Sequence, residues 1–216
     1  MKKILLSLAM VTVIGLVSIS AQKGSAFKGT INYKVSTPEA NVQGAVPQDI
    51  KVILNGNKAR IEMTMAAINQ IIILDSDAQT TVALLDVMGQ KIALKPKRSA
   101  ERLNREPIVE ITTETKEIAG YVCKKANIHY GDEQSKANPT VVYFTDQIGN
   151  NKIFYDNEYR TLPGIPMEFN FKMQGMSMQL VASSVEKGKV SNKDFEIPSD
   201  YKETTPEELR QMFGGN

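Results

Sequence analysis

Residues 167–182 carry the pattern that most restricts how this chain can fold. Apolar and polar residues alternate on both sides of Gln174-Gly175, a pair that favours a tight turn between two strands. This turn would pair apolar residues along one face: Met173 with Met176, Phe171 with Met178, Phe169 with Leu180, and Met167 with Ala182. A slip of one residue would turn the whole apolar set to the opposite face. The agreement therefore predicts an antiparallel hairpin with one buried face.

The same period of two recurs elsewhere in the chain. Residues 27–35 alternate strictly, which is typical of a strand with one face in a core. Two further tight turns are predicted, Asn55-Gly56 pairing Val52 with Ala59 and Ile50 with Ile61, and Gly89-Gln90 pairing Val87 with Ile92 and Leu85 with Leu94. More strands are expected at 107–115, 120–130, 140–146 and 195–197. About eleven or twelve short strands predict a mainly β fold, a single curved antiparallel sheet shaped as a half-barrel.

Few segments of the sequence favour helix. Thr205-Pro206-Glu207-Glu208 has an N-cap Thr, Pro at the first helical position and Glu where a capping box needs it, so a C-terminal helix is expected to pack on the sheet. Short helical turns are expected at Ser99–Arg105 and Met65–Gln70. Because no repeat or break in composition divides the chain, residues 22–216 are predicted to form one β-rich domain.

Two of the predicted strands are apolar on both faces. Ile71-Ile72-Ile73-Leu74 and Val82-Ala83-Leu84-Leu85 contain no polar alternation. A strand of this kind needs cover on both faces. Either the short helices provide that cover, or a concave surface is left open as a site for an apolar ligand.

The first 21 residues have the pattern of a secretory signal peptide. Lys2 and Lys3 precede an uncharged run, Ile4–Ala21, that ends in small residues. We expect cleavage after Ala21, which would leave an exported protein, periplasmic or secreted, with no membrane span. The single Cys, Cys123, lies far from the cleavage site, so a lipoprotein anchor is not expected. Removing the two lysines turns the net charge of +2 into zero.

The scarcity of His and Cys argues against an enzyme and against a metal or other cofactor. The chain has one His and one Cys, and His129 lies six residues beyond Cys123, about 20 Å along a strand. We expect Cys123 to be a packed core side chain and His129 a surface residue. Zinc sites need three or four His, Cys or carboxylate ligands. Asp75-Ser76-Asp77 is expected to be a polar hairpin turn rather than a cation loop.

Charge is segregated in two places. Lys95–Pro107 holds five basic and two acidic residues, and Lys193–Arg210 holds three basic and six acidic residues. These segments are expected either to be solvated and close together, or to offer a basic patch to anionic lipid headgroups through Lys95, Lys97 and Arg98. The basic stretch has no aromatic residues, so nucleic-acid binding is not expected. The sequence does not specify an oligomeric state.

Four short stretches resemble a known family. They are Asn55-Gly-Asn-Lys-Ala-Arg-Ile-Glu62, Ile118-Ala-Gly-Tyr-Val-Cys-Lys-Lys-Ala126, Leu162-Pro-Gly-Ile-Pro-Met-Glu-Phe169 and Phe195-Glu-Ile-Pro-Ser-Asp-Tyr201. Together they resemble the domain of unknown function 4412 (DUF4412) family of exported Gram-negative envelope proteins. Leu162-Pro163-Gly164-Ile165 is also partly similar to the GLPGLI envelope family. The first resemblance implies a fold like that of the lipoprotein carriers LolA and LolB, an open half-barrel that holds acyl chains, and it implies no catalytic residue.

The leading hypothesis is therefore non-enzymatic binding or carriage of an apolar ligand, a lipid or the acyl chain of a lipoprotein. The candidate lining consists of apolar residues at inward strand positions: Met63, Met65, Ile72, Leu84, Met167, Phe169, Phe171 and Met178. Such a methionine-rich surface suits core packing first, an apolar ligand second and a soft metal such as Cu(I), at Met173, Met176 and Met178, third. The alternative is a structural or interaction protein of the envelope with a filled core and no small ligand.

Overall fold

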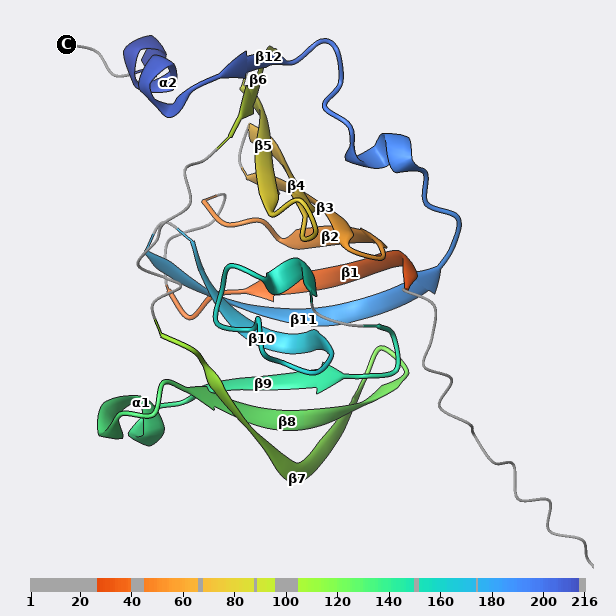
Figure 1. Cartoon of the computed structure of the whole chain (residues 1–216), viewed down its shortest axis with the longest axis vertical. Coiled ribbons are helices and arrows are strands. Elements are labelled where there is room, and N and C mark those ends of the chain that lie inside the picture. The colour runs from red at the N-terminus through yellow and green to blue at the C-terminus, as the bar shows by residue number, and fades with distance from the viewer. Residues whose placement is uncertain are drawn as a thin grey trace, which may run out of the picture.

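A computed structural model describes residues 27–39, 45–65, 68–87, 89–95, 105–149, 152–173 and 175–213. Within these residues twelve strands form one curved sheet, accompanied by two short α-helices and two 3-10 turns (Figure 1). The strands are β1 (Lys28–Ser36), β2 (Asp49–Asn55), β3 (Lys58–Met65), β4 (Ile68–Asp75), β5 (Thr80–Val87), β6 (Gln90–Leu94), β7 (Ile108–Ile118), β8 (Tyr121–His129), β9 (Thr140–Thr145), β10 (Ile165–Met173), β11 (Met176–Lys187) and β12 (Lys202–Thr204). The helical elements are α1 (Glu133–Ala137), η2 (Lys152–Phe154), η3 (Asn192–Phe195) and α2 (Pro206–Phe213).

The sheet is built from two meanders that meet at its centre. Its strand order is β12-β6-β5-β4-β3-β2-β1-β11-β10-β9-β8-β7. Strands β1 to β6 run outward from the centre, and β7 to β11 return from the opposite edge, so that β11 pairs with β1. Neighbouring strands are antiparallel except β12, which runs parallel to β6. The expectation of a mainly β fold with one curved sheet is confirmed, and the parallel edge strand is an addition to it.

The hairpin of β10 and β11 has the predicted register. Met173 pairs with Met176, Phe171 with Met178 and Phe169 with Leu180. The ladder ends at Glu168 and Val181, because β10 bulges against β9 between Pro166 and Glu168. The fourth expected pair, Met167 with Ala182, is therefore not a ladder pair, although both side chains lie in the core.

The other two predicted hairpins have the right faces and the wrong pairing. In the first, Leu54 pairs with Ala59 and the turn is Gly56-Asn57, with a positive φ of 64° at Gly56 alone, as in a type II′ turn. The predicted register would place Lys51 opposite Arg60, whereas the observed one places it opposite Glu62, at 3.4 Å between Nζ and Oε2. Opposite charges across a strand pair stabilise it and like charges do the reverse.

The second hairpin is shifted in the same way. Leu85 pairs with Ile92, and Asp86 lies opposite Lys91 rather than opposite Ala93. The Asp86 carboxylate also accepts a hydrogen bond from the backbone N–H of Gly89, at 3.0 Å. Both shifts are of two residues, which keeps every side chain on its predicted face.

Three further expectations are wrong or fall outside the described residues. The described residues of Met65–Gln70 are strand rather than a helical turn, because Met65 ends β3 and pairs with Ile68 at the start of β4. Residues 195–197 are not a strand, because Ser191 caps a 3-10 turn there through a capping box with Asp194. Of Ser99–Arg105, only Arg105 is described.

The C-terminal helix begins as expected and lies elsewhere than expected. Thr205 Oγ1 accepts the N–H of Glu208, and the Glu208 carboxylate accepts the N–H of Thr205, which completes the capping box. However, α2 follows the edge strand β12 and extends beyond that edge in Figure 1. None of its described side chains, residues 206–211, is buried. The expectation that this helix packs on the sheet is therefore wrong for the described side chains.

The main core lies on one side of the sheet, here called the inner face. It carries Ile31, Val52 and Leu54 in the centre and Ala126, Val142 and Phe144 in the other wing, all buried. Residues 146–149 and 152–164, between β9 and β10, pack into the same core and are called the covering segment. Its buried side chains are Ile148, Ile153, Tyr159 and Leu162. In Figure 1 this segment, with η2, crosses in front of β1 and β11.

A smaller apolar cluster lies on the opposite, outer face. Ile73, Leu84 and Ala93 are buried there, next to Ile71 and Val82. Phe195, Ile197 and Tyr201, from η3 and the residues after it, pack over this cluster. The prediction that β4 and β5 need cover on both faces is confirmed, and an extended C-terminal segment rather than an α-helix covers the outer face.

Candidate functional site

Six of the eight candidate lining residues belong to the core of the inner face. Residues that pair across neighbouring strands point to the same face of the sheet. Ile72 pairs with Ile61, and Met63 pairs with Ile50, so these strands turn the candidates toward one side. Four of them are buried, with Met167 and Met178 0% and 1% exposed, and the other two, Met65 and Ile72, are half-buried against the same core. The six residues are Met63, Met65, Ile72, Met167, Phe169 and Met178.

The other two candidates are placed differently. Leu84 pairs with Ile71 and Ala93, whereas the inner-face residue Ile72 pairs with the residue before Leu84. Leu84 therefore points to the outer face, where it is fully buried in the smaller apolar cluster. Phe171 shares a face with Met178 but is 39% exposed, near the hairpin end of β10. The structure therefore separates Leu84 from the other seven and leaves Phe171 on their face, beside Met178 but partly in solvent. The sequence alone could not separate Leu84 from Ile72, because both lie in strands that are apolar on both faces.

The covering segment is held on the inner face by aromatic packing. Tyr159 is 1% exposed and meets Phe169 edge to face, with ring centroids 5.3 Å apart. Phe154 packs edge to face on both of these rings. The Tyr159 hydroxyl donates to the carbonyl oxygen of Asn170 at 2.5 Å, so the buried phenol is satisfied. Burial raises the pKa of Tyr159 well above its usual range.

A hydrogen bond also ties the covering segment to the far wing of the sheet. Tyr155 Oη and Thr81 Oγ1 are 3.0 Å apart, and Thr81 lies on β5. The segment therefore spans the inner face from β10 to β5. Sequence reasoning missed these residues because Ile148, Ile153, Tyr159 and Leu162 follow neither a strand period nor a helix period.

The methionines of the β10–β11 hairpin only partly test the copper hypothesis. Met173 and Met176 pair across the turn as predicted. Met178 is buried in the core and Met176 is half-buried, while the side chain of Met173 lies outside the description. For Met178, packing among apolar side chains is the observed role.

Cys123 is a buried thiol, as predicted. It is 0% exposed and lies in the core with Ile118 and Ala126. Burial raises the pKa of Cys123 to about 11, with a further rise from the Glu168 carboxylate, against a lowering by a backbone hydrogen bond. The thiolate needed for nucleophilic chemistry is therefore scarce near neutral pH.

We expect this thiol to be unreactive in the native protein. At pH 8 a disulfide reagent such as dithionitrobenzoate should label Cys123 slowly, and unfolding in urea should make labelling complete within minutes. The pKa of the thiol is about 11 in the folded protein and 9.0 in the unfolded chain. The thiol therefore contributes its full share to the free energy of unfolding below pH 9, and this contribution is lost as pH rises toward 11. The free energy of unfolding of the wild type should therefore fall over this range more than that of Cys123→Ser. Rapid labelling of the native protein would contradict this assignment.

His129 is buried, which corrects the expectation of a surface residue. It ends β8 with 3% exposure, and its Nδ1 accepts the N–H of Gly131 at 3.0 Å. Nε2 therefore carries the proton in the neutral ring. It lies 3.1 Å from Oε1 of the exposed Glu110, but no aligned hydrogen bond is formed. The turn after β8 contacts one edge of this imidazole through Gly131, and Glu110 of β7 lies near the other.

The turn at Asp75-Ser76-Asp77 is polar, as predicted. Asp75 Oδ1 accepts the backbone N–H groups of Asp77 and Ala78, at 3.1 and 3.0 Å. The bond from Ala78 contributes most to a lowered pKa of Asp75, and Lys58 adds to the lowering. This carboxylate therefore shapes the β4–β5 turn.

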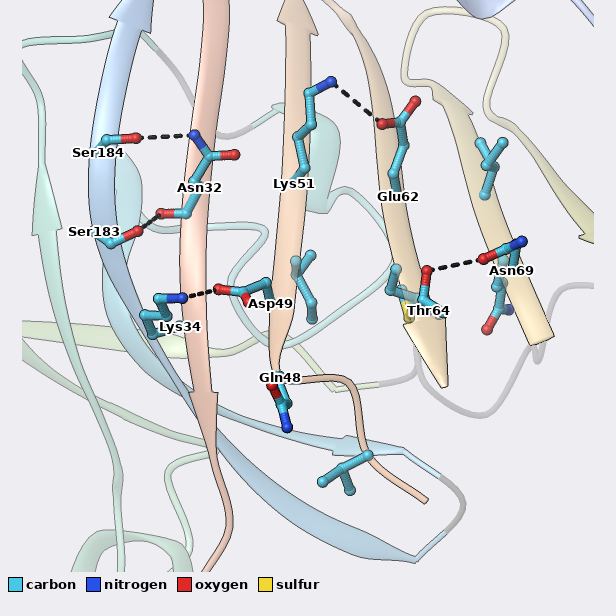
Figure 2. A pocket seen from close by; sticks show the side chains of 15 residues that line it. Asn32, Lys34, Gln48, Asp49, Lys51, Glu62, Thr64, Asn69, Ser183 and Ser184 are labelled. Atoms are coloured by element: carbon cyan, nitrogen blue, oxygen red, sulfur yellow. Dashed lines mark hydrogen bonds and ion pairs between the residues drawn. The ribbon is translucent and has the colours of Figure 1, made fainter. Parts of the chain in front are cut away.

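A polar groove of about 990 Å³ lies on the outer face (Figure 2). Neighbouring strands contribute pairs of side chains to it: Asn32 with Ser184, Lys34 with Asp49, Lys51 with Glu62, and Thr64 with Asn69. Partial burial acts to raise the pKa of Glu62, but hydrogen bonds and charge from Arg60 and Lys51 outweigh it and lower that pKa. Because the charges of this groove are paired, it is typical of a solvated sheet face. The alternating polar residues of these strands were the signal for it.

The basic and acidic segments meet at the edge of the sheet. Lys95 Nζ lies 2.9 Å from Glu203 Oε2, where β12 runs beside β6, and Lys91 pairs with Asp200 at 2.6 Å. The predicted proximity of the two segments is confirmed by the pair of Lys95 and Glu203, while Lys91 lies just before the basic segment. Of the proposed membrane-contact residues, Lys95 is thus exposed and paired, and Lys97 and Arg98 lie outside the described residues, as does the expected signal peptide at 1–21.

The described residues contain neither a candidate metal cluster nor a helix that could span a membrane. No group of three or more His, Cys, Asp or Glu side chains there is arranged to hold a metal ion. No helix in the same residues has the length and apolar character needed to cross a bilayer.

Comparison of the sequence with protein-family models gives no match, and comparison with curated proteins gives none either. The resemblance to the DUF4412 family therefore stays a prediction.

Proposed function

We propose that this is an exported envelope protein that binds or carries an apolar ligand without catalysis, on a LolA-like half-barrel. The observation that carries the proposal is the covering segment. A single irregular segment, rather than a second layer of strands or long helices, occupies the inner face over the candidate lining residues. Such a segment can be displaced with few backbone hydrogen bonds lost. The lining beneath it is rich in Met, whose flexible side chain adapts to ligands of different shape.

In this proposal the acyl chain of the ligand inserts between the sheet and the covering segment, which moves away from the inner face. Phe169 would contact an acyl chain where it now contacts Tyr159, and Met63 and Met167, which lie in the same core, would line the same space. Apolar contact is exchanged for apolar contact, so displacement costs little burial. The hydrogen bond between Tyr155 and Thr81 closes the segment over β5.

The burial of the candidate residues favours a second function. Met167 and Met178 are at most 1% exposed, and so is Leu162 of the covering segment, as in an ordinary filled core. A structural or interaction protein of the envelope needs no more than this. The two functions differ in whether an apolar molecule enters the inner face.

Lipid analysis and a gating variant test the proposal together. Protein purified without detergent should release lipid into organic solvent, identified by mass spectrometry, and the emptied protein should bind a fluorescent fatty acid. Tyr155→Phe removes the bond to Thr81 and should raise probe affinity about two- to tenfold, the value of one net hydrogen bond. Tyr143→Phe deletes a hydroxyl that bonds Glu114 on the exposed surface and should leave affinity unchanged. An empty protein that binds no probe would establish the filled-core function instead.

A further inference from the structure

A second hollow, of about 430 Å³, opens where the covering segment meets the β4–β5 turn. The segment and the residue before Pro107 form its walls together with that turn. Its lining is polar apart from one aromatic ring: Ser76, Asp77, Glu106, Lys152, Tyr155, Arg160 and Thr161. This hollow brings charges of both signs from segments far apart in the sequence to one place.

Three charged side chains of this hollow, those of Arg160, Asp77 and Glu106, form no ion pair among the described residues. Arg160 donates from Nη1 to the carbonyl oxygen of Asn157 at 3.3 Å and from Nη2 to that of Arg105, both neutral groups. Among the described residues no carboxylate forms an ion pair with this half-buried guanidinium. Asp77 accepts only the neutral amide of Asn57, at 2.7 Å, and Glu106 is exposed. The half-buried guanidinium and the two carboxylates of this hollow can therefore each form an ion pair with a group of opposite charge on a ligand.

We propose that this hollow binds the polar end of a zwitterionic amphiphile, with a phosphate at Arg160 and a primary ammonium at Asp77 and Glu106. The inference rests on the proposed function and names its ligand class. A guanidinium presents parallel N–H donors that match phosphate oxygens, and an ammonium group matches carboxylates. A purely anionic headgroup would be repelled by the two carboxylates, and a neutral one would match none of the charges of Arg160, Asp77 and Glu106.

Tyr155 connects the hollow to the inner face. Its ring lines the hollow and also packs against the main core, and its hydroxyl meets Thr81 on β5. A headgroup in the hollow would therefore direct its acyl chain past Tyr155, under the covering segment. This route places the polar and apolar ends of one ligand in two adjoining sites.

Three single-chain lipids with the same acyl chain test the headgroup. They are a lysophosphatidylethanolamine, a lysophosphatidylglycerol and a monoacylglycerol, each titrated below its micelle concentration against the bound fluorescent fatty acid. We expect the ethanolamine lipid to bind about tenfold more tightly than the neutral lipid. Arg160→Gln should remove that preference, and Arg160→Lys, which keeps the charge, should keep most of it. Glu106→Gln should remove the preference for ethanolamine over glycerol headgroups.

Controls separate this inference from the proposed function. Lys136→Gln makes the same charge change on α1, outside the hollow, and should alter no affinity. Equal binding of all three lipids, unchanged in Arg160→Gln, would overturn the headgroup site while supporting an apolar ligand. If no lipid and no probe binds, the proposed function fails. Soluble phosphoethanolamine then tests the hollow alone: a shift of the Arg160 side-chain resonances supports the site for a free headgroup, and no shift overturns it.

Discussion

Replacing Tyr159 by Ala should lower the free energy of unfolding by about 3–5 kcal/mol. The side chain is 1% exposed and packs edge to face on Phe154 and Phe169, so its removal leaves a cavity under the covering segment. The Asn170 carbonyl also loses its hydrogen-bond donor. A domain of this size is stable by about 5–15 kcal/mol, so the loss is a large fraction of the total. Urea unfolding followed by circular dichroism measures it.

Two further variants separate the contribution of the Tyr159 hydroxyl from that of its ring and compare this ring with a more exposed one. Tyr159→Phe keeps the ring and deletes the hydroxyl, and should cost about 1–3 kcal/mol for the unpaired Asn170 carbonyl. Phe171→Ala removes an aromatic ring from the same strand as Phe169 at a position that is 39% exposed, and should cost well under half as much as Tyr159→Ala. Equal effects of Tyr159→Ala and Phe171→Ala would show that the covering segment does not pack as described.

The period of two was enough to predict the sheet but not its exact pairing. The alternation of apolar and polar residues correctly predicted that Met167, Phe169 and Met178 lie on the inner face, because the pleat alone determines the face to which each side chain points. The turn residues alone allowed two registers for the hairpin of β2 and β3, which differ by a shift of two residues. The charges of Lys51, Arg60 and Glu62 distinguish the two registers. Only the observed register places Lys51 opposite Glu62, a residue of opposite charge, rather than opposite Arg60.

The candidate site was predictable only where strands form it. Leu84 lies on the outer face, beneath Phe195 and Ile197, because a strand that is apolar on both faces gives no indication of which face is inside. Tyr159 and Leu162 could not be found by any period, since an irregular segment reaches the core through the path of its backbone. Their burial depends on contacts with β strands distant in sequence.

Replacing Gly164 by Ala should lower the free energy of unfolding by at least about 3 kcal/mol, at the upper end of overpacking effects. A Cβ at this position would lie 2.4 Å from the carbonyl oxygen of Thr145, 2.8 Å from its carbonyl carbon and 2.8 Å from Cδ2 of Phe144. The first two atoms are backbone and cannot rotate away. Next along the chain, Ile165 pairs with Thr145 in the ladder of β9 and β10, so relief of the clash would open that ladder. Thermal and urea unfolding would both report the loss.

Gly188→Ala is the matched control. A Cβ there has no heavy atom within 4 Å, and the N–H of Gly188 keeps its bond to the carbonyl oxygen of Lys28, so stability should change by less than about 0.5 kcal/mol. A loss at Gly164 with none at Gly188 would assign the glycine of Leu162-Pro163-Gly164-Ile165 to close backbone packing, with Leu162 and Ile165 buried on either side of it. Wild-type stability of Gly164→Ala would instead contradict the contact of this segment with β9. The covering segment would then not be anchored where β10 begins.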